Sequence, residues 1–246
     1  EKVNMNEIAT TEKPTSTKDP KLIHNVQNPP KLRFSEFSVD NPQFDYYLVL
    51  DFEATCYDGD KPIEEFNQKL ALYEIIEFPV LVVEARSLKV EYKFHYYLKP
   101  EIHPKLNKFC TELTGITQET VDKGITLKEC LLLFEVFMKE SGILEKNFIF
   151  VTCGDWDLKT CIRNECKYKK MEYPDFMKRW VNVKNPYCEY MKHEKKTGMA
   201  GMLKGLGLEL EGRHHSGIDD CHNISKIVIE LLKKGMNFGK IIGQYK

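Results

Sequence analysis

The hydrophobic residues of this chain fall into short apolar runs that are separated by polar turns. Strands are expected at five of these runs, residues 46–50, 74–84, 93–98, 147–152 and 181–183. The run at 46–50 is apolar throughout, which is typical of a central strand that is covered on both faces. A turn is expected at residues 84–88.

Apolar residues three and four positions apart predict the helices. Helices are expected at residues 104–113 and 118–123, from Thr126 onwards, directly after the strand at 147–152, and at 218–234. Residues 173–208 are expected to be mostly helical apart from the short strand. Gly235 is expected to end the final helix. Because a later strand returns beside the first, the pattern predicts an α/β sheet with helices on both faces.

The first 41 residues differ in composition from the rest of the chain. They hold many Pro, Thr, Lys and Asn and few apolar residues, so we expect residues 1–41 to form an extended or disordered arm. Residues 42–246 are expected to form one domain. A chain of 246 residues with 42% hydrophobic content is large enough for one full core.

The overall charge of the chain excludes a surface that is positively charged throughout. The chain has 36 basic and 37 acidic residues and a formal net charge of −1, so nucleic-acid binding requires local patches. Two such patches are formed by Lys167, Lys169 and Lys170 and by Lys192, Lys195 and Lys196. Both patches are also compatible with ordinary solvated helix ends.

The cysteines and apolar runs bear on the compartment. None of the eight cysteines forms a Cys-x-x-Cys pair, which argues against a structural zinc site. The sequence contains no signal peptide and no long apolar run. We therefore expect a reducing intracellular location, cytoplasmic or nuclear or both, and no membrane partner.

Asp51 and Glu53 follow the first expected strand directly. Strand alternation places both side chains on one face, about 7 Å apart along the chain. Two carboxylates at the end of a buried strand repel each other and lose solvation, and a bound cation relieves both penalties. The alternative is that the strand ends at Asp51 and that both acids are solvated.

A second acidic cluster follows the strand at 147–152. Asp155 is expected to be the N-cap of the next helix. Asp157 then lies in the first helical turn, where the helix dipole also favours a carboxylate. Neither acid alone requires a metal. Trp156 between them is interpreted either as a core residue or as a platform for a nucleotide.

A third cluster precedes the final helix. Ser216 and Asp219 have the spacing of a capping box, which makes Ser216 the expected N-cap and places Asp220 in the first turn. His215 then lies in the loop before the helix. The ordinary pKa of an imidazole near neutrality suits a general base. The alternative is a surface histidine pair, His214 and His215, beside acids that the helix dipole favours.

Taken together, the three clusters resemble the DEDDh family of 3′–5′ exonucleases, whose motif residues correspond here to Asp51, Glu53, Asp157, His215 and Asp220. The surrounding sequence is most similar to the histone-mRNA and small-interfering-RNA 3′ exoribonuclease (enhanced-RNAi) group. The segments that carry the likeness are 49–56, 74–80, 109–117, 180–184 and 213–220. That group often has proline where this chain has His214, a change that we expect to leave the chemistry intact.

The resemblance implies an RNase-H-like exonuclease fold with a mixed central sheet. It also implies that two Mg²⁺ or Mn²⁺ ions per site are held by four carboxylates, and that His215 is the general base. The implied metal ligands are Asp51, Glu53, Asp157 and Asp220. The resemblance also implies that Glu53 is a catalytic residue. The implied pocket for the terminal nucleotide is formed by Ala54, Thr55, Phe109 and Leu113, with Trp156 at its flank.

The implied substrate is an RNA 3′ end, single-stranded or with a short overhang, from which nucleoside 5′-monophosphates are released. A DNA exonuclease of the same superfamily fits the motifs equally well. A non-catalytic RNA-binding protein on the same fold is the other alternative, and the presence of all five motif residues argues against it. The arm at 1–41 is hypothesised to bind a protein or ribonucleoprotein partner, and sequence does not separate a free enzyme from one within a larger particle.

Overall fold

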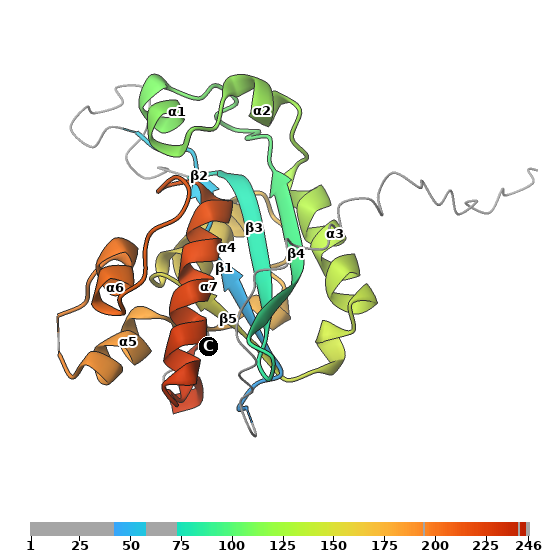
Figure 1. The fold of residues 1–246 in the computed structure, drawn as a ribbon. Coiled ribbons are helices and arrows are strands. Elements are labelled where there is room, and N and C mark those ends of the chain that lie inside the picture. Colours follow the sequence, from blue (N-terminus) through green and yellow to red (C-terminus); the bar gives the residue numbers. More distant parts are fainter. Residues whose placement is uncertain (1–41, 58–72, 194, 241, 245–246) are drawn as a thin grey trace, which may run out of the picture.

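A computed structural model describes residues 42–57, 73–193, 195–240 and 242–244 (Figure 1). The arm expected at residues 1–41 lies outside this part of the chain. Among the helices of the described residues, none is both long enough and apolar enough to cross a membrane.

One mixed sheet forms the centre of the molecule. Its strands are β1 (Tyr46–Leu50), β2 (Glu53–Ala54), β3 (Ile75–Glu84), β4 (Lys89–Tyr97), β5 (Phe148–Thr152), β6 (Arg179–Asn182) and β7 (Ile242–Gln244). β3 pairs antiparallel with β1, β2 and β4. β1 pairs parallel with β5, β5 pairs parallel with β6, and β6 pairs antiparallel with β7.

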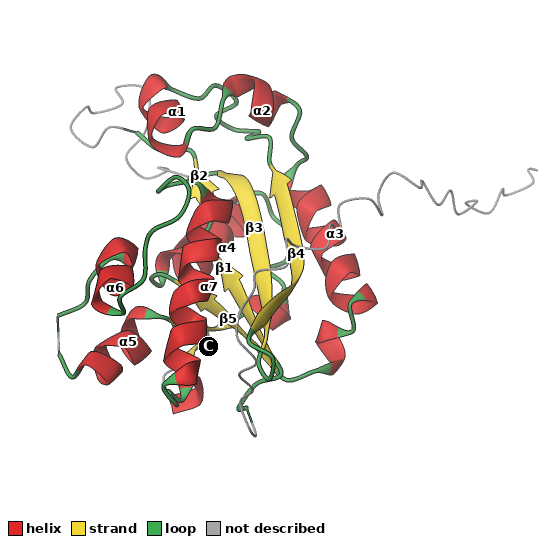
Figure 2. Cartoon of the chain, viewed as in Figure 1, coloured by secondary structure: helices red, strands yellow, loops and turns green. Residues whose placement is uncertain are grey.

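Helices surround the sheet (Figure 2). The α-helices are α1 (Lys108–Thr114), α2 (Gln118–Asp122), α3 (Leu127–Glu140), α4 (Ile162–Tyr168), α5 (Lys184–Met191), α6 (Met199–Gly205) and α7 (Gly217–Lys233). The shorter turns are η3 (Ile143–Glu145), η4 (Asp157–Cys161), η5 (Asp175–Met177) and η6 (Phe238–Lys240), of which η4 is a π-helix. α3 begins after Thr126 because Thr126 and Glu129 form a capping box. α7 ends before Gly235, which takes the left-handed conformation (φ 76°).

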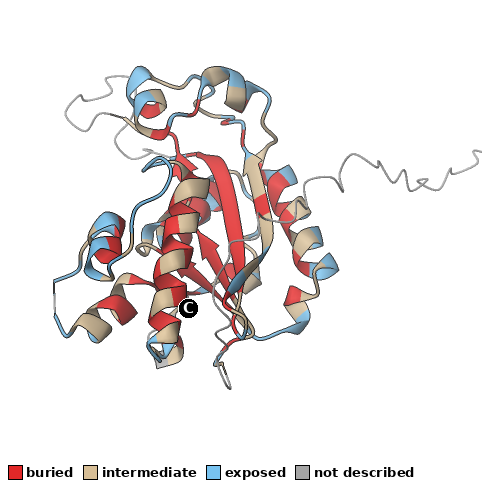
Figure 3. Cartoon of the chain, viewed as in Figure 1, coloured by how far each residue is buried: buried red, intermediate tan, exposed pale blue. Residues whose placement is uncertain are grey.

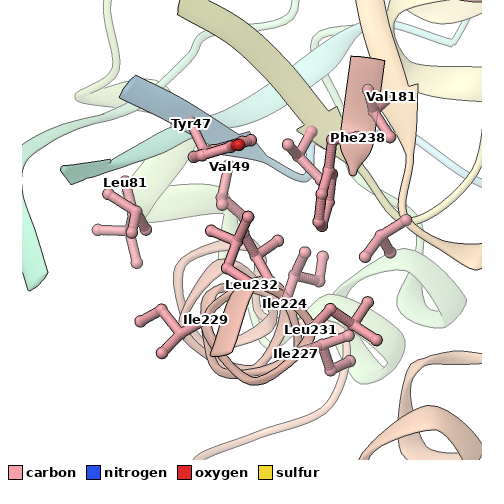
Figure 4. Packing of buried hydrophobic residues seen from close by; sticks show 14 of the residues in the cluster. Tyr47, Val49, Leu81, Val181, Ile224, Ile227, Ile229, Leu231, Leu232 and Phe238 are labelled. Atoms are coloured by element: carbon pink, nitrogen blue, oxygen red, sulfur yellow. The ribbon is translucent and has the colours of Figure 1, made fainter. Parts of the chain in front are cut away.

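The central strands are buried on both faces, as the apolar run in β1 predicts (Figure 3). Tyr47 and Val49 belong to the core cluster that α7 completes, and this packing is drawn in Figure 4. Leu48 and Leu50 belong to the opposite cluster, which contains residues of α3 and α4. The period of two along β1 therefore sends alternate side chains into two cores, and the expected helices on both faces are confirmed.

Some elements differ from the expectation. β4 begins at Lys89 and not at residue 93. The prediction missed its first residues because they alternate between exposed and half-buried positions and do not form an apolar run. The region 173–208 is less helical than expected, since it contains only a short turn before β6. The two-residue β2 and the three-residue β7 were not expected, because pairing with distant strands defines them and local sequence does not.

Adjacent leucines of α3 provide a matched test of this packing. Leu131 is 8% exposed and belongs to the same core cluster as Leu48 and Leu50, whereas Leu132 is 58% exposed. We expect Leu131→Ala to lower the free energy of unfolding by about 2–5 kcal/mol, because it removes buried methyl groups and leaves a cavity. Leu132→Ala is the control and is expected to change it by less than about 0.5 kcal/mol. Urea unfolding of both variants measures the difference, and equal effects would contradict the described face of α3.

Candidate active site

Three segments that are far apart in sequence meet at one end of the sheet. β1 and β5 are parallel neighbours, so their C-terminal ends lie at the same edge. Asp51 follows β1, Asp157 follows β5, and Asp220 comes from the first turn of α7. A cleft of about 400 Å³ is lined by Asp51, Glu53, Trp156, Asp157, Lys184, His214, His215 and Asp220, among other residues.

Three of the four carboxylates of this cleft are buried, and Asp51 is half-buried. Glu53 is 9% exposed, Asp157 is 6% exposed and Asp220 is 3% exposed. Asp51, Glu53 and Asp220 each offer an oxygen atom, and these atoms lie within 4.8 Å of one another. Asp157 Oδ1 accepts a hydrogen bond of 3.0 Å from the backbone N–H of Phe52, which ties the first and second acidic clusters together. The interpretation of Glu53 as a solvated acid is therefore wrong.

Burial is the main cause of a raised pKa at all four carboxylates. It raises the pKa of Glu53 to about 9 and the pKa of Asp157 and of Asp220 to about 6. The pKa of Asp51 is raised well above its ordinary value by burial and, next, by the charge of Asp157. At Glu53 the charges of neighbouring carboxylates are the next cause after burial. The arrangement is electrostatically unfavourable in the absence of a cation.

The donor set suits a hard divalent cation. All the candidate ligand atoms in this acidic cluster are carboxylate oxygens, which Mg²⁺ and Mn²⁺ prefer. Asp220 Oδ1 is buried and has no hydrogen-bond partner among the described residues. A buried acceptor without a partner carries a desolvation cost that a bound cation would offset. The residues present therefore fit a divalent metal.

His215 lies in the loop before α7, as expected. Its backbone is left-handed (φ 64°), an uncommon conformation for a residue other than glycine. The His215 N–H donates a 2.9 Å hydrogen bond to Asp220 Oδ2, which holds the loop against the helix. Partial burial lowers the pKa of His215, and the charges of His214 and Arg213 lower it further. A lowered pKa keeps the imidazole neutral, so its ring nitrogen is available to accept a proton near neutral pH.

The expected capping box at Ser216 and Asp219 is wrong. The side chain of Ser216 makes no capping hydrogen bond, and the Asp219 carboxylate accepts the backbone N–H of Arg213. Glu77 of β3 takes the capping role instead. Its carboxylate accepts the N–H of Gly217 at 2.9 Å and the N–H of Ile218 at 3.1 Å. Sequence reasoning missed this role of Glu77. The available signal was an acidic residue within the otherwise apolar run of β3.

Glycine is required where α7 approaches the sheet. A Cβ atom at Gly217 would lie 2.7 Å from the backbone oxygen of Asp51 and 3.1 Å from Glu77 Oε2. The absence of a side chain therefore allows the first turn of α7 to contact the first acidic cluster. The preceding loop is fixed on its other side by Arg213, whose Nη2 donates to the carbonyl oxygens of Glu112 and Leu113 in α1.

Asp155 is structural and directly precedes the helix, but its side chain does not cap the helix as expected. Its carboxylate accepts hydrogen bonds from Trp180 Nε1 at 2.9 Å and from Asn182 Nδ2 at 3.2 Å. Both partners lie in β6, so Asp155 joins the turn after β5 to the neighbouring strand. Local spacing predicts a cap at this position, whereas the tertiary partners of the carboxylate cannot be read from the sequence.

The expected nucleotide-binding residues do not all reach the cleft. Trp156 lines it, is 40% exposed, and makes an edge-to-face contact with Tyr73, so its interpretation as a core residue is wrong. Ala54 and Thr55 are buried, and Thr55 Oγ1 accepts the N–H of Glu74. Phe109 and Leu113 lie on α1. These last four are not part of the described cleft lining, and their role in substrate binding stays a prediction.

One member of the basic patches is not available to a ligand. The ammonium group of Lys169 lies 2.8 Å from Glu165, 2.8 Å from Glu101 and 3.2 Å from Glu74. Burial alone lowers the pKa of Lys169, but these acidic partners raise it overall. Lys169 therefore stabilises the fold, while the other five lysines of the two patches are exposed.

The raised pKa values predict how the metal-free protein responds to pH. Below the unfolded pKa of about 4 the four carboxylates do not oppose folding. Stability is then lost as pH rises through about 6 for Asp157 and Asp220 and towards about 9 for Glu53, since the folded state must release protons that it holds tightly. We expect the melting temperature in EDTA to fall between about pH 5 and about pH 8.

Saturating Mg²⁺ should reduce this fall, and Asp157→Asn should make it shallower in EDTA because one charge is absent. Thermal melting of both proteins across the pH range measures the effect. An identical slope in the wild type and in Asp157→Asn would show that the cleft carboxylates do not cause it.

Comparison with known proteins places this geometry in a family. The family model described as "RNase_T: Exonuclease" matches residues 48–228. Human "ERI1 exoribonuclease 3" is 44% identical over 198 residues, which cover 80% of this chain and 56% of the relative. Human "3'-5' exoribonuclease 1" is 35% identical over 218 residues, which cover 87% of this chain and 60% of the relative. The chain thus spans little more than half the length of these relatives.

Solved structures agree with this placement. The nuclease domain of 3'hExo, a DEDDh family member, was solved bound to rAMP; it superposes with a TM-score of 0.74 at 35% identity and covers 80% of this chain and 96% of that chain. A structure of 3'-end specific recognition of histone mRNA stem-loop by 3'-exonuclease gives a TM-score of 0.74 at 32% identity, covering 86% of this chain and 73% of that chain. The expected RNase-H-like exonuclease fold is confirmed. The chain belongs to the exonuclease family and, within it, to the DEDDh exonucleases.

Proposed function

We propose that this chain is a metal-dependent 3′–5′ exoribonuclease that releases nucleoside 5′-monophosphates from RNA 3′ ends. The observation that carries the proposal is the convergence of three buried carboxylates, the half-buried Asp51 and one histidine in a single cleft. The similar nuclease domain binds rAMP, and the similar 3'-exonuclease recognises the 3′ end of a histone mRNA stem-loop. Both relatives support RNA over DNA as the substrate.

Asp51, Glu53, Asp157 and Asp220 are proposed to hold two Mg²⁺ or Mn²⁺ ions. Bound there, the metals would neutralise the phosphodiester and stabilise the leaving oxygen. The four carboxylates come from three separate backbone segments and three of them are buried, which favours fixed positions when substrate enters. Asp157 is oriented by the N–H of Phe52, and Asp220 by the N–H of His215.

His215 is proposed to take the proton from the attacking water. Its side chain is exposed at the mouth of the cleft, where water and substrate have access. Its lowered pKa keeps the accepting nitrogen free of a proton at neutral pH. The N–H of His215 donates to the Asp220 carboxylate, so the backbone of the proposed base is held next to a proposed metal ligand.

The terminal nucleotide is proposed to lie between Trp156 and α1. An exposed aromatic side chain offers a face for stacking a base, as in other proteins that bind single strands. Phe109 is 37% exposed on α1, and Arg213 links the end of α1 to the His215 loop. Ala54 and Thr55 connect this region to Glu53. A single strand or a short overhang fits such a site better than a continuous duplex.

The cellular setting is also part of the proposal. All eight cysteines are free thiols, which supports an intracellular reducing compartment, cytoplasmic or nuclear. A protein or ribonucleoprotein partner that binds the arm at residues 1–41 remains a hypothesis, and deletion of the arm tests it. Hydrolysis of a short generic RNA should persist after that deletion.

Metal removal and loss of the base test the reaction separately. EDTA should abolish RNA digestion, and Mg²⁺ or Mn²⁺ should restore it.

His215→Ala should lower turnover by about 10²–10⁴-fold while RNA binding is retained, because only proton transfer is removed. The assay uses labelled single-stranded RNA, a 3′-overhang duplex, a stem-loop and DNA. Undiminished hydrolysis in EDTA would rule out the metal mechanism, and a preference for DNA would favour the alternative substrate.

Asp155 and Asp157 form a matched pair with different expected failures. Asp155→Ala leaves the buried indole N–H of Trp180 without its partner, so stability should fall by about 1–3 kcal/mol while activity falls modestly. Asp157→Asn keeps the shape but removes a charge, so hydrolysis should nearly vanish and the metal-free protein should be at least as stable as the wild type. Melting curves and RNA digestion are measured for both. An active Asp157→Asn enzyme beside a folded but inactive Asp155→Ala enzyme would reverse the two roles.

A further inference from the structure

Two consecutive histidines stand at the mouth of the cleft. The rings of His214 and His215 are stacked, with centroids 4.1 Å apart and an angle of 16° between their planes. Both histidines are exposed, whereas Asp220 behind them is buried. One ring nitrogen from each histidine and one carboxylate oxygen of Asp220 lie within 4.8 Å of one another. This second cluster shares only Asp220 with the acidic cluster of Asp51 and Glu53.

The chemistry of the second cluster differs from that of the acidic one. Imidazole nitrogens favour borderline transition-metal ions such as Zn²⁺ over Mg²⁺, which prefers oxygen ligands. Three protein ligands with an open fourth position are enough to bind Zn²⁺. The in-plane lone pairs of two stacked rings do not converge on one ion, so one exposed imidazole must turn about its side-chain bonds for both to bind. The pair of histidines thus gives this side of the cleft a metal preference that four carboxylates do not have.

An unpartnered atom points to a ligand at this position. Asp220 is 3% exposed, and its Oδ2 is occupied by the N–H of His215. Its Oδ1 is buried and has no hydrogen-bond partner within the described part of the chain. The guanidinium of Arg213 is engaged elsewhere, since it donates to carbonyl oxygens of α1. Neither of these groups therefore blocks a cation from reaching Asp220 Oδ1.

We propose that His214, His215 and Asp220 form an inhibitory site for Zn²⁺. Zn²⁺ at this site occupies the lone pair of the His215 ring nitrogen, so the ring no longer accepts a proton. It also draws on Asp220, which the acidic cluster shares, so Mg²⁺ and Zn²⁺ compete. The inhibition, but not the binding, rests on the proposed role of His215 as general base. His214 contributes a ligand to this site and is not proposed to transfer a proton in hydrolysis.

The test compares the full chain with two single variants. His214→Ala removes one proposed ligand, and His193→Ala is the control because it removes an exposed histidine from the loop after α5, outside both metal clusters. Zn²⁺ affinity is measured by competition with a chromogenic chelator at the same low, fixed Mg²⁺ concentration for each protein. Free cysteines also bind Zn²⁺, so the readout is the difference between proteins and not the total bound.

We expect His214→Ala to weaken Zn²⁺ binding by at least about tenfold, the lower limit for loss of even a supporting residue of a metal site. His193→Ala should bind as the wild type does. In the RNA digestion assay, inhibition is expressed relative to the activity of each protein without Zn²⁺, because His214 lines the cleft beside His215. Added Zn²⁺ should inhibit the wild type and the control at concentrations at least about tenfold lower than those that inhibit His214→Ala. Raising Mg²⁺ should relieve the inhibition.

Equal Zn²⁺ affinity in the wild type and His214→Ala would overturn the site. Weaker binding in His214→Ala with unchanged inhibition would overturn the inhibitory role. A wild type that binds Zn²⁺ through His214 but digests no RNA in Mg²⁺ would retain the zinc site and contradict the proposed function. The two proposals therefore fail in different measurements. Melting curves confirm that each variant is folded.

Discussion

The position of the whole cleft depends on one buried carboxylate, that of Glu77. It accepts two N–H groups at the start of α7 and also lies 2.8 Å from His95 Nε2 of β4. The first N–H groups of a helix have no partner within the helix, and a carboxylate satisfies them and favours the positive end of the helix dipole. Because Glu77 belongs to the central sheet, this group anchors the first turn of α7 to the sheet. Asp220 and the His215 loop are positioned by the same contact.

The sheet topology brings the acids together, and their burial makes the site costly. Parallel pairing of β1 with β5 puts Asp51 and Asp157 at one edge, and the approach of α7 through Gly217 adds Asp220. Each carboxylate loses solvation there, as its raised pKa reports. The two hydrophobic clusters on either side of the sheet stabilise the arrangement against this repulsion. The fold therefore stores unfavourable charge in a place where a cation relieves it.

The sequence predicts the features that depend on neighbours along the chain. β1, β5, the start of α3 at Thr126 and the end of α7 at Gly235 follow from apolar runs and local caps. The resemblance to a known family identifies five residues, all of which line the cleft. The features that were missed depend on distant partners. The spacing of Ser216 and Asp219 is that of a cap, but Glu77 competes successfully because a buried carboxylate needs two donors.

Asp155 and Lys169 show the same limit in another form. Each has a plausible local role, as a helix cap and as part of a basic patch, but each is engaged by residues from other elements. Spacing along the chain does not report such partners, because burial creates the demand for them. A charged residue near a motif is therefore informative about function only when its own neighbours leave it free.

The five motif residues divide into two groups by exposure, and the division matches the work proposed for them. Acids that hold cations must keep their geometry, so burial and backbone hydrogen bonds at Asp157 and Asp220 are useful. A base that exchanges protons with water must remain accessible, and the side chain of His215 is exposed. The left-handed backbone at His215 brings both needs together, because its N–H binds a buried acid while its ring stays at the surface. The same exposure leaves the ring open to His214 and to competing metals.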